Sequence, residues 1–412
     1  MKSLAEWLRY LGRLHPSEID LGLDRVRAVA NRLGLLPVPY KVITVGGTNG
    51  KGTTCHLLEG MYRHAGYKTG LGTSPHLLEF NERIVINGVI IDDQSIVKAF
   101  ARIEAGRAEI SLTYFEFSLL ATLIIFKEAR IDIAILEVGL GGRLDAVNII
   151  DADVAAITTI DFDHMNYLGN TRELIGFEKA GIFRAGKSAV CGDARVPLSI
   201  QNHAESIKAP LLCQSRDFHF HKKNCTWDWE SDMQSLKGLP MPAIPLQNAA
   251  TALMIVECMN AYMPVKREAI DYALENVRVT GRFQVFKRDC LIIVDVAHNP
   301  ESARLLAENL QAMSCQGKTL AVFSALGDKD ISGIVDPLKS NIDTWYYATL
   351  DTDRAATKDQ LTACLHPYKH QNYATIDLAF KAALKAATAE DRIVVFGSFY
   401  VVAVVLPQLT QE

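Results

Sequence analysis

The most constraining feature of this sequence is a β-branched run that stops at a cluster of glycines. The run is Val42–Val45, and the following stretch, Gly46–Gly52, contains four glycines and Lys51. Glycines let backbone N–H groups approach an anion, and the positive end of a helix that starts there adds to the attraction. The pattern therefore predicts a strand, a phosphate-binding loop and a helix in direct succession.

This loop departs from the usual P-loop spacing. Val45 stands where the first glycine is expected, and Gly52 separates Lys51 from Thr53. The alternative is a plain glycine-rich turn, but four glycines followed by Lys-x-Thr favour phosphate binding. In that interpretation Lys51 reaches the outer phosphates of a nucleotide, and a threonine hydroxyl holds Mg²⁺.

Composition bounds the class of protein. A length of 412 residues favours two domains, and 49% hydrophobic with 22% charged residues is typical of a globular protein. The net charge of −4 gives no electrostatic basis for a nucleic-acid partner. The eight cysteines form no C-x-x-C pair, which favours a reduced, cytoplasmic protein. Neither the N-terminal residues nor the apolar stretch 117–126 predicts a signal peptide or membrane span.

Apolar runs alternate with segments of helical periodicity over the first two thirds of the chain. A hairpin is expected at 83–91 around Asn-Gly, and 214–240 shows only weak β character. Strands are expected at 42–46, 68–74, 131–137 and 154–160, and helices at 4–15, 24–34, 113–130, 171–184 and from 247 onward. Between the first two helices, Asp20 or Asp24 could cap the second. The alternation predicts an α/β fold with a P-loop and a doubly wound, mostly parallel sheet.

A second, smaller α/β unit is expected after Thr280. Its strands are predicted at 291–295, 319–325, 344–349 and 392–396, with helices between them, as in a Rossmann-like domain. We place the linker at about 276–288. The expected domains are an N-terminal ATP-binding P-loop domain, 1–280, and a C-terminal Rossmann-like domain, 281–412.

Polar side chains follow four of the predicted strands. Thr53, Ser74, Glu137 and His164 each come after a different strand, and open α/β sheets place function at these carboxyl ends. Oxygen ligands suit Mg²⁺, and a strand that ends in a carboxylate opposite a phosphate loop is the Walker-B arrangement. Taken singly, Glu137 could be a capping acid and His164 a core histidine.

Lys179 lies in the helix that follows His164. It could be a surface lysine paired with Glu178, or a lysine held near a metal.

Together, these stretches resemble folylpolyglutamate synthases of the Mur ligase superfamily. The motifs follow the family's order: 47–54, Ser74–Leu77, 136–145, Asp163–Gly169, Glu178–Phe183, 281–283 and 295–300. Asp20–Leu23 and Thr113–Glu116 are similar to the bacterial bifunctional form, dihydrofolate synthase/folylpolyglutamate synthase, in which they contact dihydropteroate. The resemblance implies a Mur ligase central-domain type sheet for the first domain and a glutamate ligase domain for the second.

The resemblance also implies a reaction. ATP phosphorylates a substrate carboxylate, and the amine of L-glutamate attacks the acyl phosphate to form an amide. The implied substrates are dihydropteroate, reduced folates, L-glutamate and ATP. The residues implied to be catalytic are Lys51, His298 and Lys179. The implied ATP contacts are Thr48, Asn49, Gly50, Lys51, Gly52, Thr53, Asn248, Arg282 and Asp295, with ATP expected between the two domains.

The implied cofactor is Mg²⁺, as two ions, with a monovalent cation as an open addition. Its ligands are expected to be Ser74, Glu137 and His164, with Thr53 as a further one, and Lys179 resembles the family's carbamylated lysine. The implied pterin-side residues are Asp20, Leu21, Gly22, Leu23, Thr113, Tyr114, Phe115, Glu116, Leu144, Asp145 and Ala146.

Three other interpretations stay open at this point. The chain could be a monofunctional folylpolyglutamate synthase. It could be a Mur-type peptidoglycan ligase, although the forty or so residues before Val42 are too few for a UDP-sugar domain. It could be a nucleotide-dependent switch, although a switch needs no second nucleotide-facing domain. The resemblance implies a monomer with no nucleic-acid or membrane partner, and binding of ATP is expected to bring the domains together.

Overall fold

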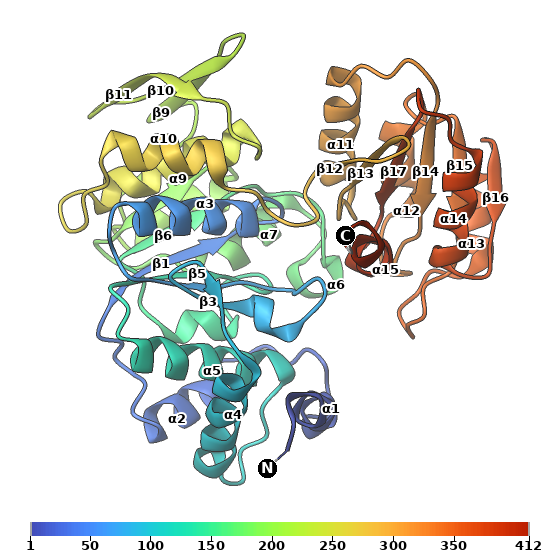
Figure 1. Ribbon diagram of the computed structural model, residues 1–412. Helices are drawn as coiled ribbons and strands as arrows, with labels where there is room; N and C mark the ends of the chain where they lie inside the picture. Colours follow the sequence, from blue (N-terminus) through green and yellow to red (C-terminus); the bar gives the residue numbers. More distant parts are fainter. Residues whose placement is uncertain (1, 411–412) are drawn as a thin grey trace. The chain divides into compact units, whose positions relative to one another are not determined.

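The computed structural model describes residues 2–410 of the chain and contains two compact units that divide between Val277 and Arg278 (Figure 1). We describe each unit in turn. In the first, α1 (Leu4–Leu14) begins with a capping box between Ser3 and Glu6, and α2 (Asp24–Arg32) follows. The residue before α2 is Leu23, and no side chain caps it. The alternative that Asp20 or Asp24 caps this helix is therefore wrong.

The first unit is built on an eight-stranded sheet with the order β4-β3-β2-β5-β1-β6-β7-β8. Six strands are parallel: β1 (Lys41–Gly46), β2 (Thr69–Gly72), β5 (Ile133–Glu137), β6 (Val154–Ile157), β7 (Ser188–Cys191) and β8 (Leu211–Cys213). The predicted Asn-Gly hairpin supplies the antiparallel edge, β3 (Ile84–Ile86) and β4 (Val89–Ile90). The predicted P-loop, mostly parallel fold is confirmed.

Helices cover both faces of this sheet (Figure 1). One layer contains α3 (Lys51–His64), α9 (Leu246–Met259) and α10 (Arg267–Asn276), and the other contains α4 (Asp93–Arg107) and α5 (Tyr114–Ala129). The apolar stretch 117–126 is the buried centre of α5, as predicted. The remaining helices are α6 (Met165–Leu168), α7 (Arg172–Ala180) and α8 (Leu198–Ser206), with short 3₁₀ turns at Phe80–Arg83 and Ala146–Ile149.

The stretch with weak β character forms a separate three-stranded antiparallel sheet: β9 (Phe218–Lys222), β10 (Thr226–Ser231) and β11 (Ser235–Pro240). Trp227 and Trp229 are fully buried. The indole N–H of Trp229 donates to the carbonyl of Ala250 on α9 at 3.1 Å, which anchors this sheet to the helix layer.

The second unit has a six-stranded sheet with the order β12-β13-β17-β14-β15-β16. Its strands are β12 (Gln284–Lys287), β13 (Leu291–Val294), β14 (Thr319–Phe323), β15 (Thr344–Tyr347), β16 (His370–Asn372) and β17 (Arg392–Phe396). Its helices are α11 (Pro300–Ala312), α12 (Ile331–Val335), α13 (Lys358–Leu365), α14 (Ile376–Ala386) and α15 (Phe399–Thr410), with a 3₁₀ turn at Asp336–Leu338.

One boundary expectation was too wide. The sequence predicts a linker at about 276–288, but the second half of that segment contains β12, which pairs antiparallel with β13. Since α10 ends at Asn276 and β12 begins at Gln284, the connecting segment is 277–283. Over residues 2–410, no helix has the length and apolar character needed to cross a bilayer.

Candidate active site

The glycine cluster forms a tight turn between β1 and α3. Gly47 and Gly50 have φ of +138° and +84°, and Gly50 is the residue that precedes α3. A Cβ on Gly47 would lie 1.9 Å from the Thr158 hydroxyl oxygen, and a Cβ on Gly50 would lie 2.5 Å from the amide oxygen of Asn248. Glycine is required at both positions because of backbone conformation and because of space. α3 begins at Lys51, so its N-terminus lies directly at the loop.

Side chains of the loop hold it in place. The ammonium of Lys51 donates to the carbonyls of Gly47 and Thr48, both at 3.1 Å. The hydroxyl of Thr48 donates to the carbonyl of Asp161 at 3.0 Å, and the N–H of Asn49 donates to the Thr159 hydroxyl at 3.1 Å. The loop is therefore attached to the segment that follows β6 and leads to His164.

Thr53 lies in the first turn of α3. Its hydroxyl donates to the carbonyl of Gly50 at 2.9 Å and accepts from the side-chain amide of Asn248 at 2.9 Å. Asn248 lies near the start of its helix, as the sequence predicts. It is the third residue of α9, and its side chain contacts the phosphate loop.

Glu137 ends β5, the strand beside β1. Its carboxylate is buried and accepts the backbone N–H of Ser74 at 3.0 Å. A Cβ on Gly52 would lie 3.5 Å from the same carboxylate, so Glu137 reaches the first turn of α3. The structure thus brings Ser74, Glu137 and the phosphate loop together at the carboxyl edge of β2, β5 and β1.

Lys179 is buried in α7, and its ammonium donates to the carbonyl of Gly47 at 2.8 Å. Glu178 is paired with Arg143 at 2.8 Å. The surface-lysine alternative is therefore wrong, because Lys179 points at the phosphate loop. Lys51 and Lys179 thus donate to the same carbonyl oxygen, that of Gly47.

His164 precedes α6 in a left-handed conformation, with φ of +51°. Its side chain is one-third exposed, so it is not a core histidine. The hydroxyl of Thr48, which bonds the carbonyl of Asp161, places the His164 segment beside the loop. Within residues 2–410, no group of three or more His, Cys, Asp or Glu side chains could hold a metal ion. A cation here would take hydroxyl, phosphate and water oxygens besides carboxylate, which suits Mg²⁺.

Arg83 belongs to this region but was missed in the sequence. Its Nε donates to Nδ1 of His76 at 2.8 Å, and its guanidinium lies 5.5 Å from the centre of the Tyr114 ring. Burial lowers the pKa of Arg83, and the nearby Tyr114 and Glu137 act in the opposite direction. With Ser74 and Glu137 it lines a cavity of about 20 Å³. In the sequence Arg83 reads only as the first residue of a hairpin.

The three stretches expected on the pterin side also converge. The N–H of Gly22 donates to the carbonyl of Leu144 at 3.2 Å. Arg25 lies 2.7 Å from a carboxylate oxygen of Asp20 and 3.3 Å from one of Glu116, which joins the first stretch to α5. Within these stretches, a capping box joins Thr113 and Glu116, while other side chains pack on the core: Leu23, Tyr114, Phe115 and Ala146. Leu21 is half-buried in the turn before α2.

Asp145 is a second buried acid of this region, besides Glu116. Its carboxylate accepts the N–H groups of Leu140 at 2.9 Å and Val147 at 3.0 Å, and so closes the loop after β5. Burial raises the pKa of Asp145 to about 6, and the backbone donors offset only part of that effect. Burial therefore disfavours the charged form of this side chain relative to that of an exposed aspartate.

In the second unit, Arg282, Asp295 and His298 gather at the carboxyl end of β13. Asp295 accepts the N–H groups of Phe283 and Ala297, both at 2.7 Å. Burial raises the pKa of Asp295, and the positive charge of Arg282 opposes that rise. Nδ1 of His298 lies 2.8 Å from the carbonyl of Val296, which fixes the proton on Nδ1 because a carbonyl only accepts.

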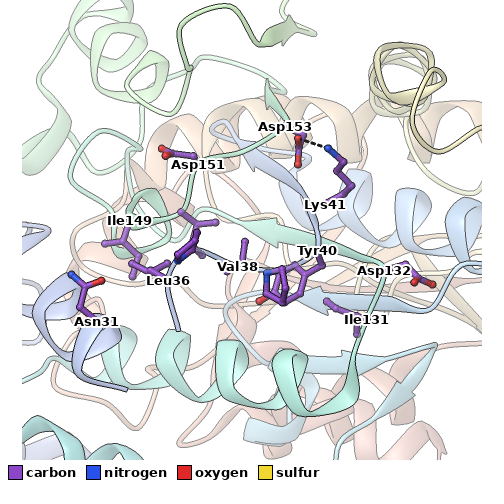
Figure 2. Close-up of a pocket in the computed structure, with 13 residues that line it drawn as sticks. Asn31, Leu36, Val38, Tyr40, Lys41, Ile131, Asp132, Ile149, Asp151 and Asp153 are labelled. Atoms are coloured by element: carbon purple, nitrogen blue, oxygen red, sulfur yellow. Dashed lines mark hydrogen bonds and ion pairs between the residues drawn. The ribbon is translucent and has the colours of Figure 1, made fainter. Parts of the chain in front are cut away.

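A larger hollow of about 770 Å³ lies elsewhere, at the amino ends of β1, β5 and β6 (Figure 2). Tyr40, Ile131 and Ile149 line it, and Lys41 is paired with Asp153 at its rim. None of the predicted site residues lines this hollow. The chemistry-bearing side chains are at the opposite edge of the sheet.

Two parts of the chain match domains of known protein families. The Mur ligase middle domain matches residues 45–208, and the Mur ligase glutamate ligase domain matches residues 281–399. The chain is 44% identical to a dihydrofolate synthase/folylpolyglutamate synthase from Escherichia coli K12, over 98% of this chain and 94% of that protein. This chain belongs to the dihydrofolate synthase/folylpolyglutamate synthase family of Mur ligases.

Solved structures agree with this assignment. One is E. coli FolC in complex with DHPP and ADP, with a TM-score of 0.95 and 44% identity, over 99% of this chain and 97% of that chain. Another is the bifunctional enzyme of Yersinia pestis complexed with AMPPNP and Mn, with a TM-score of 0.94 and 46% identity, over 99% and 98%.

Proposed function

We propose that this chain is a bifunctional ATP-dependent ligase that joins L-glutamate to dihydropteroate, forming dihydrofolate, and to reduced folates, extending their glutamate tail. The observation that carries the proposal is the convergence of Lys51, Glu137 and Lys179 on one phosphate loop. A phosphate loop with a carboxylate and two lysines supports phosphoryl transfer to a substrate carboxylate. Support also comes from the near-full-length similarity to bifunctional synthases and from the DHPP, ADP and AMPPNP named in their structures.

The chemistry needs activation because a carboxylate does not acylate an amine at neutral pH. The γ-phosphoryl group of ATP is transferred to a carboxylate oxygen, and ADP leaves. The glutamate amine then attacks the carbonyl carbon, the amide bond forms, and phosphate departs with the carbonyl–oxygen bond broken. Catalysis of both steps rests mainly on positioning and on neutralising charge.

Each residue of the loop has a part in this scheme. Backbone N–H groups from Gly50 to Thr53 hold the phosphates at the N-terminus of α3, whereas the N–H groups of Thr48 and Asn49 donate to Thr159 and keep the loop in place. The ammonium of Lys51, which bonds two loop carbonyls here, turns toward the outer phosphates when they are bound. Asn248 holds the hydroxyl of Thr53 and contacts the nucleotide. Arg282, Asp295 and His298 of the second unit are assigned to the same nucleotide.

The donor set at the edge of the sheet fits Mg²⁺. Ser74, Glu137, His164 and Thr53 offer hydroxyl, carboxylate and imidazole groups, and Glu137 lies at the helix N-terminus where phosphate would bind. When bound, Mg²⁺ neutralises charge on the phosphoryl group that is transferred. The count of two ions and the use of a monovalent cation are part of the proposal, and both are measured by titrating Mg²⁺ and K⁺ into the assay.

Lys179 is proposed to carry a carbamate. A buried ammonium beside a metal repels it, whereas a carbamate offers oxygen ligands instead. Lys179 is buried and its nitrogen bonds the carbonyl of Gly47, so a carbamate on this nitrogen would lie at the phosphate loop. A Lys179→Ala variant should regain part of its activity when a short carboxylate such as acetate is added, while Lys179→Arg should not.

The substrate's aromatic part is proposed to bind where Asp20–Leu23, Thr113–Glu116 and Leu144–Ala146 meet. Arg83 lies beside Tyr114 and Glu137 and is proposed to attract the substrate carboxylate. We also propose that the protein acts in the cytoplasm as a monomer. All eight cysteines are free, which supports a reducing compartment.

The test is a turnover assay with ATP and labelled L-glutamate, first with dihydropteroate and then with tetrahydrofolate. Incorporation with both substrates is expected. Incorporation with tetrahydrofolate alone would make the enzyme monofunctional. ATP hydrolysis that depends on neither substrate would overturn the proposal, and a UDP-muramyl substrate serves as the negative control.

A further inference from the structure

The turn from β17 into α15 is fixed by a glycine. Gly397 has φ of +109°, and a Cβ there would lie 2.0 Å from the carbonyl oxygen of Ser324. The next residue, Ser398, is buried, and its hydroxyl accepts the N–H of Tyr400 at 3.2 Å. These constraints determine where Phe399, the first residue of α15, lies.

The ring of Phe399 is half-buried and contacts the side chains of Arg282 and His298, which are assigned above to the nucleotide. The guanidinium carbon of Arg282 is 5.4 Å from the centre of the Phe399 ring. The ring of His298 is 5.8 Å from the same centre, at an interplanar angle of 54°. Arg282 comes from the connecting segment and His298 from the turn after β13, so Phe399 joins three segments that are distant in sequence.

This contact has a consequence for Arg282. An arginine side chain has several rotatable bonds, and it loses rotamer entropy when it is held in one orientation. An aromatic face below the guanidinium offsets part of that loss through a cation–π contact. The ring also packs beside His298, whose Nδ1 is already bonded to Val296.

We propose that Phe399 is a positioning residue that holds Arg282 and His298 ready for the nucleotide. The proposal rests on the proposed function, which assigns these two residues to ATP. Phe399 itself would touch neither the phosphates nor the reacting carboxylate. Its loss should therefore weaken nucleotide binding and leave the affinity for dihydropteroate unchanged.

The informative variants are Phe399→Leu, which keeps apolar bulk but removes the ring face, and Phe399→Tyr, which keeps the ring. For Phe399→Leu, the KM for ATP and the Kd for ADP should both rise by about tenfold, within the range of a cation–π contact. The KM for dihydropteroate should stay within twofold of the original. Phe399→Tyr should restore nucleotide affinity.

Tyr368→Leu is the matched control. Tyr368 is a half-buried aromatic residue of the same unit that packs on Trp345, at 6.2 Å between ring centres, near β16 at the other end of the sheet. This variant should lower the melting temperature without changing the Kd for ADP. A purely structural role of Phe399 would make the two leucine variants behave alike.

A double-mutant cycle completes the test. In an Arg282→Ala background, Phe399→Leu should weaken ADP binding far less than it does alone, because its effect acts through Arg282. Equal effects in both backgrounds, or an unchanged Kd in Phe399→Leu, would overturn the proposal. ADP binding is measured by calorimetry without turnover. A chain that binds ADP but ligates no glutamate would therefore contradict the proposed function and still test Phe399.

Discussion

The side-chain amide of Asn248 donates to the hydroxyl of Thr53 at 2.9 Å, although 195 positions separate the two residues. The same amide group lies where a side chain on Gly50 would have to go. α9 therefore packs against the phosphate loop through Asn248. A larger side chain in the loop would collide with this helix, although the helix is distant in the sequence.

This contact with Asn248 makes Gly50→Ala a severe change. The φ of +84° costs an L-residue about 1–2 kcal/mol, and the methyl group would also overlap Asn248. We expect a loss of stability above that range and a loss of nucleotide binding, measured by denaturant unfolding and ADP titration. Gly66→Ala is the control, because Gly66 has a similar φ of +95° with nothing within 4 Å of a Cβ. Equal costs at the two positions would show that Asn248 yields freely.

Lys51→Met should separate catalysis from folding. The ammonium bonds two loop carbonyls, so stability should change by about 1 kcal/mol. Without this charge on the transferred phosphoryl group, kcat/KM should fall by about 10²–10³-fold. Lys41→Met is the control, since Lys41 pairs with Asp153 at the opposite end of β1. A drop of less than tenfold in Lys51→Met would remove Lys51 from the catalytic group.

Glu137→Gln should abolish the response to Mg²⁺. The amide oxygen can still accept the N–H of Ser74, so the fold should persist while the negative charge is lost. We expect activity to drop by about 10²–10³-fold, and excess Mg²⁺ to restore little of it. Glu257→Gln is the matched control. Glu257 lies on α9, is also buried, and accepts the hydroxyl of Ser231 at 2.8 Å. Activity titrated against Mg²⁺ after chelation distinguishes the two variants.

Asp145 should make stability depend on pH. Its pKa in the folded protein is about 6, above the ordinary 3.8, so the folded chain binds this proton more tightly than the unfolded chain does. The contribution of this protonated side chain to the free energy of unfolding is complete below about pH 4 and is lost as the pH rises through 6. Between pH 5 and 8, the unfolding free energy of the original protein should fall relative to that of Asp145→Asn by on the order of 1 kcal/mol. A difference that stays constant with pH would contradict the raised pKa.

The local parts of the fold and site were predictable from the sequence. The glycine cluster, the strands that end at Ser74 and Glu137, and the Asn-Gly hairpin carry their own signals within a few residues. Because parallel strands share an edge, strand ends alone placed Glu137 beside the phosphate loop. The roles assigned to these residues stay predictions until the variants above are measured.

Other parts depend on contacts that no short window contains. The β12 and β16 strands are short edge strands, so pairing defines them more than composition does. The aromatic stretch around Trp227 was uninformative because its partner, α9, is distant. Arg83 and Phe399 have ordinary sequence surroundings, and only the folded chain shows what each of them touches.

The connecting segment has one further consequence. The carbonyl of Gly281 accepts the N–H of Val296 at 2.9 Å, and the N–H of Gly281 donates to the side chain of Gln284 at 3.1 Å. Residues from Gly281 onward are thus fastened to the sheet of the second unit. The N–H of Phe283, the residue after Arg282, donates to the carboxylate of Asp295, so Arg282 and Asp295 belong to one hydrogen-bonded framework within this unit.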